Sequence, residues 1–181
     1  MLTIDEINRA NLPSVLGELI YALEYRNERV ESLYDKDGDN GITIPENLFI
    51  IGTMNTADRS VGHIDYAIKR RFAFVDVLPN ESVINTDFGK NLFNKVAELF
   101  YKKDGDKKIN SDYLASDFDF KDVQLGHSYF ILKGGDAKEQ KDELALRLKY
   151  EILPVLREYV KDGLLLENAK TKLEEIEIFE L

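Results

Sequence analysis

The sequence has 181 residues, enough for one domain or for one domain with a small additional unit. Hydrophobic residues make up 44% and charged residues 32%, which is the composition of a soluble globular protein. The formal net charge of −10 disfavours direct binding to a nucleic-acid backbone, because the most basic short stretch is only Lys69–Arg71.

Several classes of protein are excluded or disfavoured by what the sequence lacks. It has no cysteine, which excludes disulfides, thiolate metal sites and a cysteine nucleophile. Its two histidines, His63 and His127, do not favour a histidine-rich metal site. No apolar run approaches ~18 residues, and the first residues do not resemble a signal peptide. We therefore expect a cytoplasmic protein with no membrane span.

The first half of the chain predicts alternating strands and helices. Met1–Ile4 is an apolar run typical of a buried strand, and a domain that opens on such a strand indicates truncation. A helix follows with its cap at Asn11, and its apolar side chains recur at helical spacing from residue 12 to residue 23. The polar stretch 26–46 predicts a surface hairpin or loop with its tip at Gly38–Gly41.

The chain then returns to apolar runs. Asn47–Met54 is typical of a strand that is buried on both faces, and a polar turn over 55–63 follows it. A short helix is predicted at about 61–70, and Phe72–Leu78 predicts a further strand that Pro79 ends.

Beyond residue 79 the pattern is helical. The expected elements are a helix over 84–103, a charged loop over Lys102–Lys108, short helices over 110–122, a long helix over 137–161 that Pro154 kinks or divides, and an acidic tail over 164–181. The predicted fold class is therefore α/β. Part of a parallel-sheet core occupies residues 1–79, and a helical subdomain with the acidic tail occupies residues 80–181.

Two acidic residues end the first predicted strand. Asp5 and Glu6 would lie at the carboxyl edge of a parallel sheet, where α/β folds bind their ligands. There Asp5 could help to hold Mg²⁺ and Glu6 could activate a water molecule. On this motif alone, two solvated acids at a strand end explain the pattern equally well.

The second apolar strand ends in the string Gly52–Ser60. The Asn55 carboxamide could donate to a γ-phosphate and accept from a water molecule. Spacing alone favours a plainer reading for the charged pair Asp58 and Arg59, in which Asp58 or Ser60 caps the next helix and Arg59 is solvated.

Two arginines end the next predicted helix. Arg70 and Arg71 lie near its C-terminus, where the helix dipole favours cations. The functional alternative is an arginine finger that contacts phosphates bound by a neighbouring subunit.

Taken in order, the strings IDEINRAN, IIGTMNTADRS and DYAIKRRFAF resemble the McrB group of AAA+ proteins, the nucleotide-driven motors of modification-dependent restriction systems of the 5-methylcytosine type. MNTADR at Met54–Arg59 matches that group's signature, and LGHSYF at Leu125–Phe130 resembles its lid region. The resemblance covers most of residues 1–160 and implies the C-terminal part of an AAA+ core followed by a helical lid.

The resemblance also implies residue roles. Asp5 matches the Walker B metal residue and Glu6 the catalytic glutamate, while Asn55 matches the sensor. Asp58 and Arg59 match the signature's charged pair, which we assign to nucleotide binding together with Asn55.

Further roles follow for the two arginines and for the lid. Arg70 and Arg71 match the arginine finger that acts in trans. His127 and Ser128 lie in the lid string, where they could approach a nucleotide, although a lone histidine is more often structural.

One element of the family is absent from the sequence. No string of the form G-x-x-x-x-G-K-[ST] occurs, so the backbone N–H groups that cradle β- and γ-phosphates are missing. We expect Mg²⁺ and GTP or ATP to act in the full-length protein, and we expect this chain alone to bind no nucleotide tightly and to be inactive.

Three functional hypotheses remain open. In the first, the chain belongs to a GTP- or ATP-hydrolysing motor that assembles as a hexameric ring, works with an McrC-like nuclease subunit and reaches DNA only through other domains or the assembled complex. In the second, it is a non-catalytic interaction or ring-capping module that supplies Arg70 or Arg71 to a complete neighbour. In the third, it is part of a MoxR-like AAA+ chaperone, which the MNTADRS string disfavours.

Overall fold

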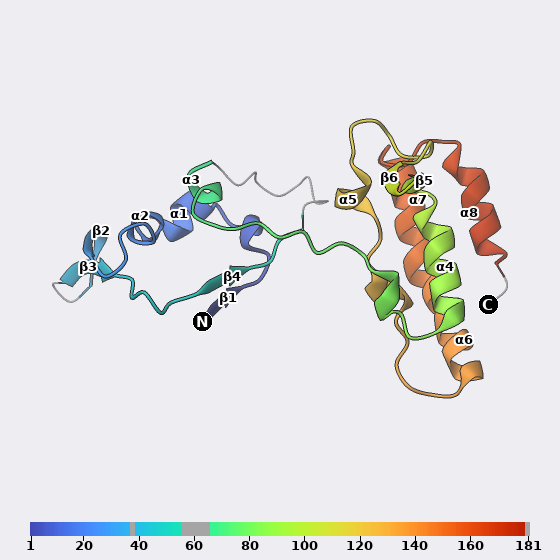
Figure 1. Cartoon of the computed structure of the whole chain (residues 1–181), viewed down its shortest axis with the longest axis horizontal. Coiled ribbons are helices and arrows are strands. Elements are labelled where there is room, and N and C mark those ends of the chain that lie inside the picture. Colours follow the sequence, from blue (N-terminus) through green and yellow to red (C-terminus); the bar gives the residue numbers. More distant parts are fainter. Residues whose placement is uncertain (37–38, 56–65, 180–181) are drawn as a thin grey trace. The chain divides into compact units, whose positions relative to one another are not determined.

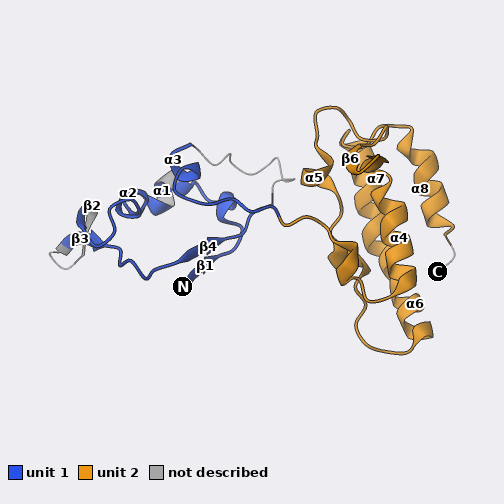
Figure 2. Cartoon of the chain, in the orientation of Figure 1, with its two compact units in different colours: residues 1–76 blue, residues 77–181 orange. Residues whose placement is uncertain are grey.

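The computed structural model describes residues 1–36, 39–55 and 66–179. The chain forms two compact units, Met1–Asp76 and Val77–Leu181 (Figure 2). Among the described helices, none combines the length and apolar character needed to cross a membrane.

The described part of the first unit forms two small sheets (Figure 1). Strand β1 (Leu2–Ile4) pairs in parallel with β4 (Ile50–Gly52), with Ile4 opposite Gly52. Strands β2 (Arg29–Lys36) and β3 (Asp39–Thr43) form an antiparallel pair, so the hairpin or loop predicted over 26–46 is a hairpin, and Gly41, predicted at its tip, lies within β3 opposite Glu31. The parallel pair matters for function because it brings two strand ends, far apart in sequence, to one edge.

Short helices pack beside the parallel strands. A 3-10 helix covers Ile7–Arg9 and the remaining helices are α1 (Leu12–Leu16), α2 (Leu19–Ala22) and α3 (Tyr66–Lys69). Their core consists of three buried residues and four partly buried ones, namely Ile7, Leu12, Ile68, Ile4, Leu16, Ile20 and Phe72. The core explains why the apolar residues after Asp5-Glu6 recur at helical spacing: they hold the carboxyl edge of the sheet against α1 and α3.

The single helix predicted over 12–23 is divided in the structure. The break lies at Gly17, whose φ of +43° is in the left-handed region that glycine adopts without a side-chain clash. A pattern of apolar residues at helical spacing therefore continued across a turn, because both short helices face the same core.

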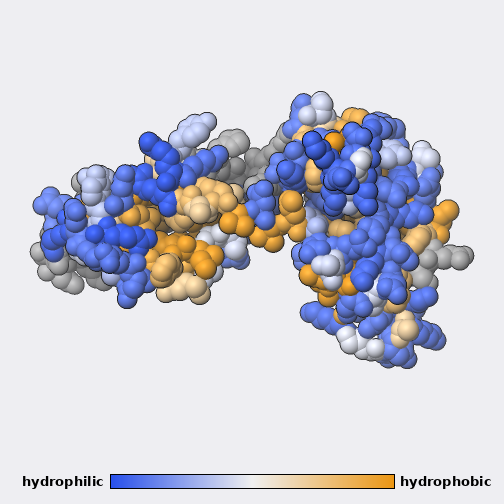
Figure 3. Space-filling model, in the orientation of Figure 1, coloured by the Kyte–Doolittle hydropathy of each residue, from blue (hydrophilic) through white to orange (hydrophobic). Residues whose placement is uncertain are grey.

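Two predictions about the strands of this unit were wrong. The strand β4 is shorter than the predicted Asn47–Met54, and it is not buried on both faces, since Phe49 and Ile51 are 68% and 50% exposed. Figure 3 shows apolar residues gathered on the visible face of the unit over β1 and β4. The segment Phe72–Leu78 forms no strand, and Val75 and Val77 within it are exposed. Strands need a partner for their backbone N–H and C=O groups, and the described residues supply none here.

The second unit is mainly helical. Its helices are α4 (Asp87–Ala97), α5 (Phe120–Val123), α6 (Ala137–Arg147), α7 (Leu153–Lys161) and α8 (Ala169–Glu177), with 3-10 helices at Glu81–Val83 and His127–Phe130. The aromatic rings of Phe93 and Phe130 meet edge to face, with centroids 5.3 Å apart, at the centre of its core. The acidic tail is folded, because Leu173 and Ile176 of α8 are buried.

The long helix predicted over 137–161, which Pro154 was expected to kink or divide, is one continuous helical run with a π-helical turn just before Pro154. Between α6 and α7 one turn, Leu148–Ile152, is a π-helix in which the Leu153 N–H donates to the carbonyl of Leu148. Pro154 follows immediately in the first turn of α7 and has no N–H to donate to the turn before it.

The predicted loop Lys102–Lys108 is instead a β-hairpin. Strands β5 (Tyr101–Asp104) and β6 (Lys107–Asn110) pair antiparallel around Gly105, whose φ is +60°. The Asp104–Gly105 pair is a turn signal that fits this hairpin. The strands were not predicted because the residues on either side of the turn are rich in lysine.

Candidate functional site

The carboxyl ends of β1 and β4 bring Asp5 and Thr53 together. The Thr53 N–H donates to the Ile4 carbonyl over 3.0 Å, which continues the parallel ladder past the last paired residues. The Thr53 hydroxyl donates to Oδ1 of Asp5 and accepts from the backbone N–H of Glu6 over 3.1 Å. One side chain, on the residue that follows β4, thus hydrogen-bonds to both acidic residues that follow β1.

Glu6 occupies an unusual backbone conformation. Its φ and ψ are both 49°, a left-handed geometry that costs a residue with a side chain about 1–2 kcal/mol. The next N–H, of Ile7, donates to the Thr53 carbonyl over 2.8 Å and holds the turn in place. The Glu6 carboxylate forms an ion pair with Arg9, and both side chains are about half exposed. A pair this exposed contributes little stability and opens readily.

Asn55 lies at the same edge. Its carbonyl accepts a hydrogen bond of 3.1 Å from the Asn8 side chain, which is 9% exposed in the 3-10 turn after Glu6. Gly52 permits this close approach, because a Cβ there would lie 3.0 Å from Cδ1 of Ile7. The structure therefore brings three predicted site residues to one edge: Asp5, Glu6 and Asn55. Asp58 and Arg59 lie outside the described residues.

Thr53, Asn8 and Arg9 were not predicted as site residues. Arg9 and Asn8 lie in the IDEINRAN string, and Thr53 immediately precedes the MNTADR string. A hydroxyl at the end of a strand beside an acidic strand end is the signal that could have identified Thr53.

The two arginines after α3 are placed differently. Arg71 donates to the Ala67 carbonyl over 2.7 Å and pairs with Glu24, and its side chain is only 18% exposed. Its Nε is buried without a hydrogen-bond partner among the described residues. Arg70 is exposed, and its Nε donates to the Tyr66 carbonyl over 3.3 Å. Arg71 is thus held inside the unit, whereas Arg70 faces outward.

The acidic edge fits a magnesium ion that is held mainly by water and phosphate. Asp5, Thr53 and Asn55 offer hard oxygen ligands, and Mg²⁺ is usually bound through one or two carboxylates while it keeps several waters. No group of three or more acidic, histidine or cysteine side chains that could hold a metal occurs among residues 1–36, 39–55 and 66–179.

The lid string is fixed by one arginine. Arg147 of α6 donates to the carbonyls of Ser128, Tyr129 and Ile131, the shortest of these bonds being 2.9 Å. His127 accepts the backbone N–H of Asn80 at its Nδ1 over 3.2 Å. Both His127 and Ser128 are therefore anchored within the second unit.

The chain matches two family descriptions. Residues 1–72 match the AAA domain of the dynein-related subfamily, and residues 106–166 match the McrB alpha-helical lid domain. Together with the small parallel sheet and the helical second unit, these matches confirm the predicted fold class, a partial α/β module followed by a helical lid.

Two curated proteins are similar to the chain. The "Type IV methyl-directed restriction enzyme EcoKMcrB subunit" of Escherichia coli K12 is 36% identical over 171 residues, which cover 88% of this chain and 36% of that protein. The "Type II restriction enzyme BsuMI component YdiS" of Bacillus subtilis 168 is 41% identical over 88 residues, which cover 41% of this chain and 25% of that protein. The chain thus corresponds to about a third or less of the length of each relative.

Proposed function

The chain belongs to the McrB type of AAA+ proteins, and on that basis we propose that it forms the Walker B edge and the lid of a nucleoside triphosphatase that powers DNA restriction. The observation that carries the proposal is the joining of Asp5, Glu6 and Asn55 at one strand edge by Thr53 and Asn8. Carboxylates and a carboxamide at the carboxyl edge of a parallel sheet suit phosphoryl transfer to water.

Each residue at the edge takes one part of the reaction. Asp5 would hold the water shell of a bound Mg²⁺, and that ion would neutralise charge on the phosphates. Glu6 orients the attacking water and accepts its proton, after its exposed ion pair with Arg9 opens. The Asn55 carboxamide donates to the γ-phosphate and accepts from the water, while Asn8 keeps its backbone in place. Asp58 and Arg59 assist at the nucleotide as the family signature implies.

The arginine finger is supplied in trans. Of the two candidates, geometry favours Arg70, since Arg71 already binds the Ala67 carbonyl and Glu24. This role requires assembly, and we propose a hexameric ring of the full-length protein that works with an McrC-like nuclease subunit. Contact with DNA is made through other parts of that assembly, which agrees with the net charge of −10 on this chain.

The second candidate function is a non-catalytic ring-capping or interaction module. It is favoured by the exposed position of Arg70. Such a module would complete the active site of a neighbour and hydrolyse nothing itself. A MoxR-like chaperone segment is less well supported, because residues 106–166 match the McrB lid.

A chimera tests the proposal. In it, residues 1–181 replace the matching segment of the Escherichia coli relative, which covers 36% of that protein. We expect Mg²⁺-dependent hydrolysis of GTP or ATP by the chimera and none by residues 1–181 alone. Turnover by the isolated chain would contradict the expected inactivity, and a folded chimera that binds nucleotide without turnover would favour the capping module.

A further inference from the structure

The second unit contains a surface cavity that the proposed hydrolysis does not use. Its volume is about 370 Å³, and it is bounded by the segment Leu78–Pro79, by β6 and by α5. The residues that line it are Leu78, Pro79, Lys107, Lys108, Phe120, Lys121 and Gln124. All of them belong to the unit Val77–Leu181, whereas the acidic edge belongs to the unit Met1–Asp76.

The walls of the cavity combine apolar and cationic groups. Phe120, which is 8% exposed, lines the cavity together with Leu78 and Pro79. Lys107 and Lys121 are exposed, and neither forms an ion pair with a described residue. An apolar surface beside unpaired ammonium groups suits a ligand that carries an apolar group next to an anion.

Gln124 adds a polar group to the wall. Its Nε2 is buried and has no hydrogen-bond acceptor among the described residues. Buried donors are nearly always paired in folded proteins, so an acceptor supplied from outside would complete this one.

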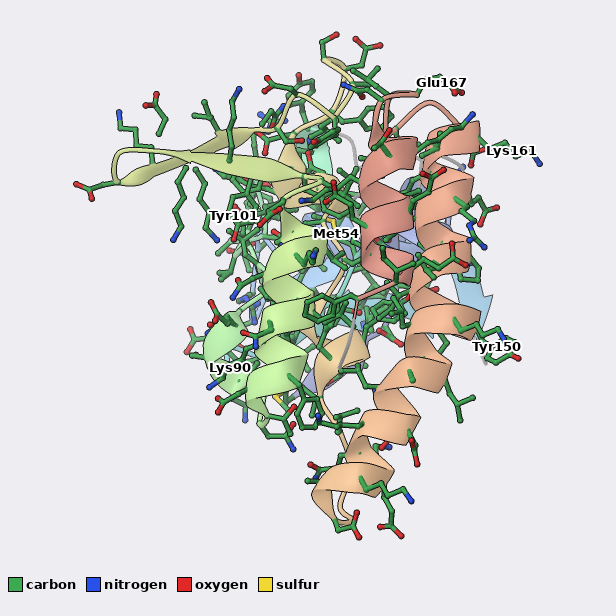
Figure 4. All side chains as sticks on the ribbon, turned by 90° about the vertical axis from the view of Figure 1, so that its right-hand side faces the viewer. Met54, Lys90, Tyr101, Tyr150, Lys161 and Glu167 are labelled. Carbon is green, nitrogen blue, oxygen red and sulfur yellow. The ribbon has the colours of Figure 1, made fainter. Side chains whose placement is uncertain are left out.

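Two hydrogen bonds made by the Asn110 side chain hold the walls of the cavity together. Asn110 at the end of β6 donates from Nδ2 to the Phe118 carbonyl over 2.7 Å and accepts the Phe120 N–H at Oδ1 over 3.0 Å. The hairpin is therefore fixed to the start of α5. Figure 4 shows the hairpin projecting from the helices of this unit, with Tyr101 at its base. The Lys108 ammonium lies 4.0 Å from the centroid of that ring, which orients it without neutralising it.

We propose that this cavity binds a short acidic segment of a partner protein, with one apolar side chain seated against Phe120 and flanking carboxylates paired with Lys107 and Lys121. Residues 101–124 hold five lysines and six aspartates, a net of 5 − 6 = −1. A nucleic acid, with its evenly repeated phosphates, would meet these aspartates along its length, whereas a short segment can set one or two carboxylates against the lysines alone. The inference does not depend on nucleotide hydrolysis.

Fluorescence anisotropy with three labelled probes tests the site on the full chain 1–181. The probes are the capped peptide Gly-Asp-Phe-Glu-Gly, its neutral analogue Gly-Asn-Phe-Gln-Gly and a ten-residue oligothymidylate. The site variant is Lys107→Glu/Lys121→Glu, and the matched control is Lys138→Glu/Lys161→Glu, which makes the same change of charge on α6 and α7. Lys161 is labelled at the end of α7 in Figure 4.

We expect the acidic peptide to bind the wild-type chain at least about tenfold more tightly than the neutral peptide. The site variant should lose at least about tenfold in affinity, as expected when about 1.4 kcal/mol of interaction is removed, and the control should stay within about twofold. Affinity for the wild-type chain should also fall with added salt, which provides a readout independent of the variants.

Four results would overturn the inference. They are no binding of the acidic peptide at about 1 mM, equal binding of the two peptides, equal losses in the site and control variants, or tighter binding of the oligothymidylate that depends on Lys107 and Lys121. The last result would assign the cavity to nucleic acid.

Discussion

The Thr53 hydroxyl is a single hydrogen-bonding group between two acidic residues, and its removal should loosen both. In Thr53→Val the Glu6 N–H loses its acceptor and the Asp5 carboxylate loses a donor. We expect a loss of about 1 kcal/mol in stability and at least about tenfold faster hydrogen exchange at the Glu6 amide. Thr43→Val, at the exposed end of β3, serves as the control. An unchanged exchange rate at Glu6 would show that Thr53 does not hold the edge.

Substitution of the two adjacent arginines should have different effects, with Arg71 needed for stability and Arg70 needed for turnover. Arg71→Ala removes contacts to Ala67 and Glu24 inside the unit, so we expect a loss of about 1–2 kcal/mol in urea unfolding. Arg70→Ala should change stability by less than about 0.5 kcal/mol, because Arg70 is exposed.

For turnover by the chimera we expect the larger loss in Arg70→Ala and not in Arg71→Ala. Arg70→Ala should lower turnover at least about 100-fold, since an arginine finger contributes a factor of about 10³–10⁵. A larger loss of turnover in Arg71→Ala than in Arg70→Ala, with stability taken into account, would assign the finger to Arg71.

At the residue scale, the sequence could predict the chemistry of the edge but not its supports. Asp5 and Asn55 each follow an apolar run, so their place at a strand end could be inferred from pattern. The roles of Asn8 and Arg71 could not, because each depends on a partner about 47 residues away in sequence. Such pairings appear only once the strands have been set side by side.

At the element scale, α6 offers the clearest test of local stability. Asp136 accepts the N–H groups of Lys138 and Glu139 over 2.9 Å, and the Glu139 side chain accepts the Asp136 N–H. Asp136→Ala should therefore cost about 1 kcal/mol, measured by thermal unfolding. Asp142→Ala, in the middle of the same helix, should cost clearly less, and equal losses would mean that the capping box is not what stabilises α6.

The elements that sequence reasoning missed share a physical cause. The segment 72–78 has the composition of a strand, yet a strand forms only where a partner accepts its hydrogen bonds. The hairpin β5–β6 has lysines in place of the usual strand residues, and its pairing is supported by the hydrogen bond from the Asn110 side chain to the Phe118 carbonyl. Composition reports what a segment prefers, whereas its tertiary neighbours decide what it forms.

At the scale of the whole molecule, stability should fall in alkaline solution. Burial raises the pKa of Tyr159 above its ordinary value of 10.0, and the hydrogen bond to Glu98 raises the pKa of Lys172 above 10.5. The folded state therefore keeps protons that the unfolded state releases, so this stability is present below about pH 10 and is lost as the pH rises further.

Tyr159→Phe tests that dependence, because it keeps the ring that meets Phe100 edge to face. Urea unfolding between about pH 9 and 12 should show a shallower decline in this variant than in the wild-type chain. Tyr150→Phe is the matched control, since Tyr150 is 65% exposed. The same slope in all three proteins would exclude Tyr159 as a source of the alkaline loss.

In the assembled protein, hydrolysis should depend most strongly on Glu6, the proposed acceptor of the water proton. The most direct measurement is single-turnover hydrolysis by the chimera with Glu6→Gln, alongside nucleotide binding and with Glu46→Gln, an exposed residue of the same unit, as control. We predict that Glu6→Gln keeps nucleotide affinity within about threefold and lowers hydrolysis by about 10²–10⁴-fold, while the control stays at the level of the unchanged chimera. Hydrolysis within about threefold of the control would contradict the assignment of the β1 edge as the catalytic edge.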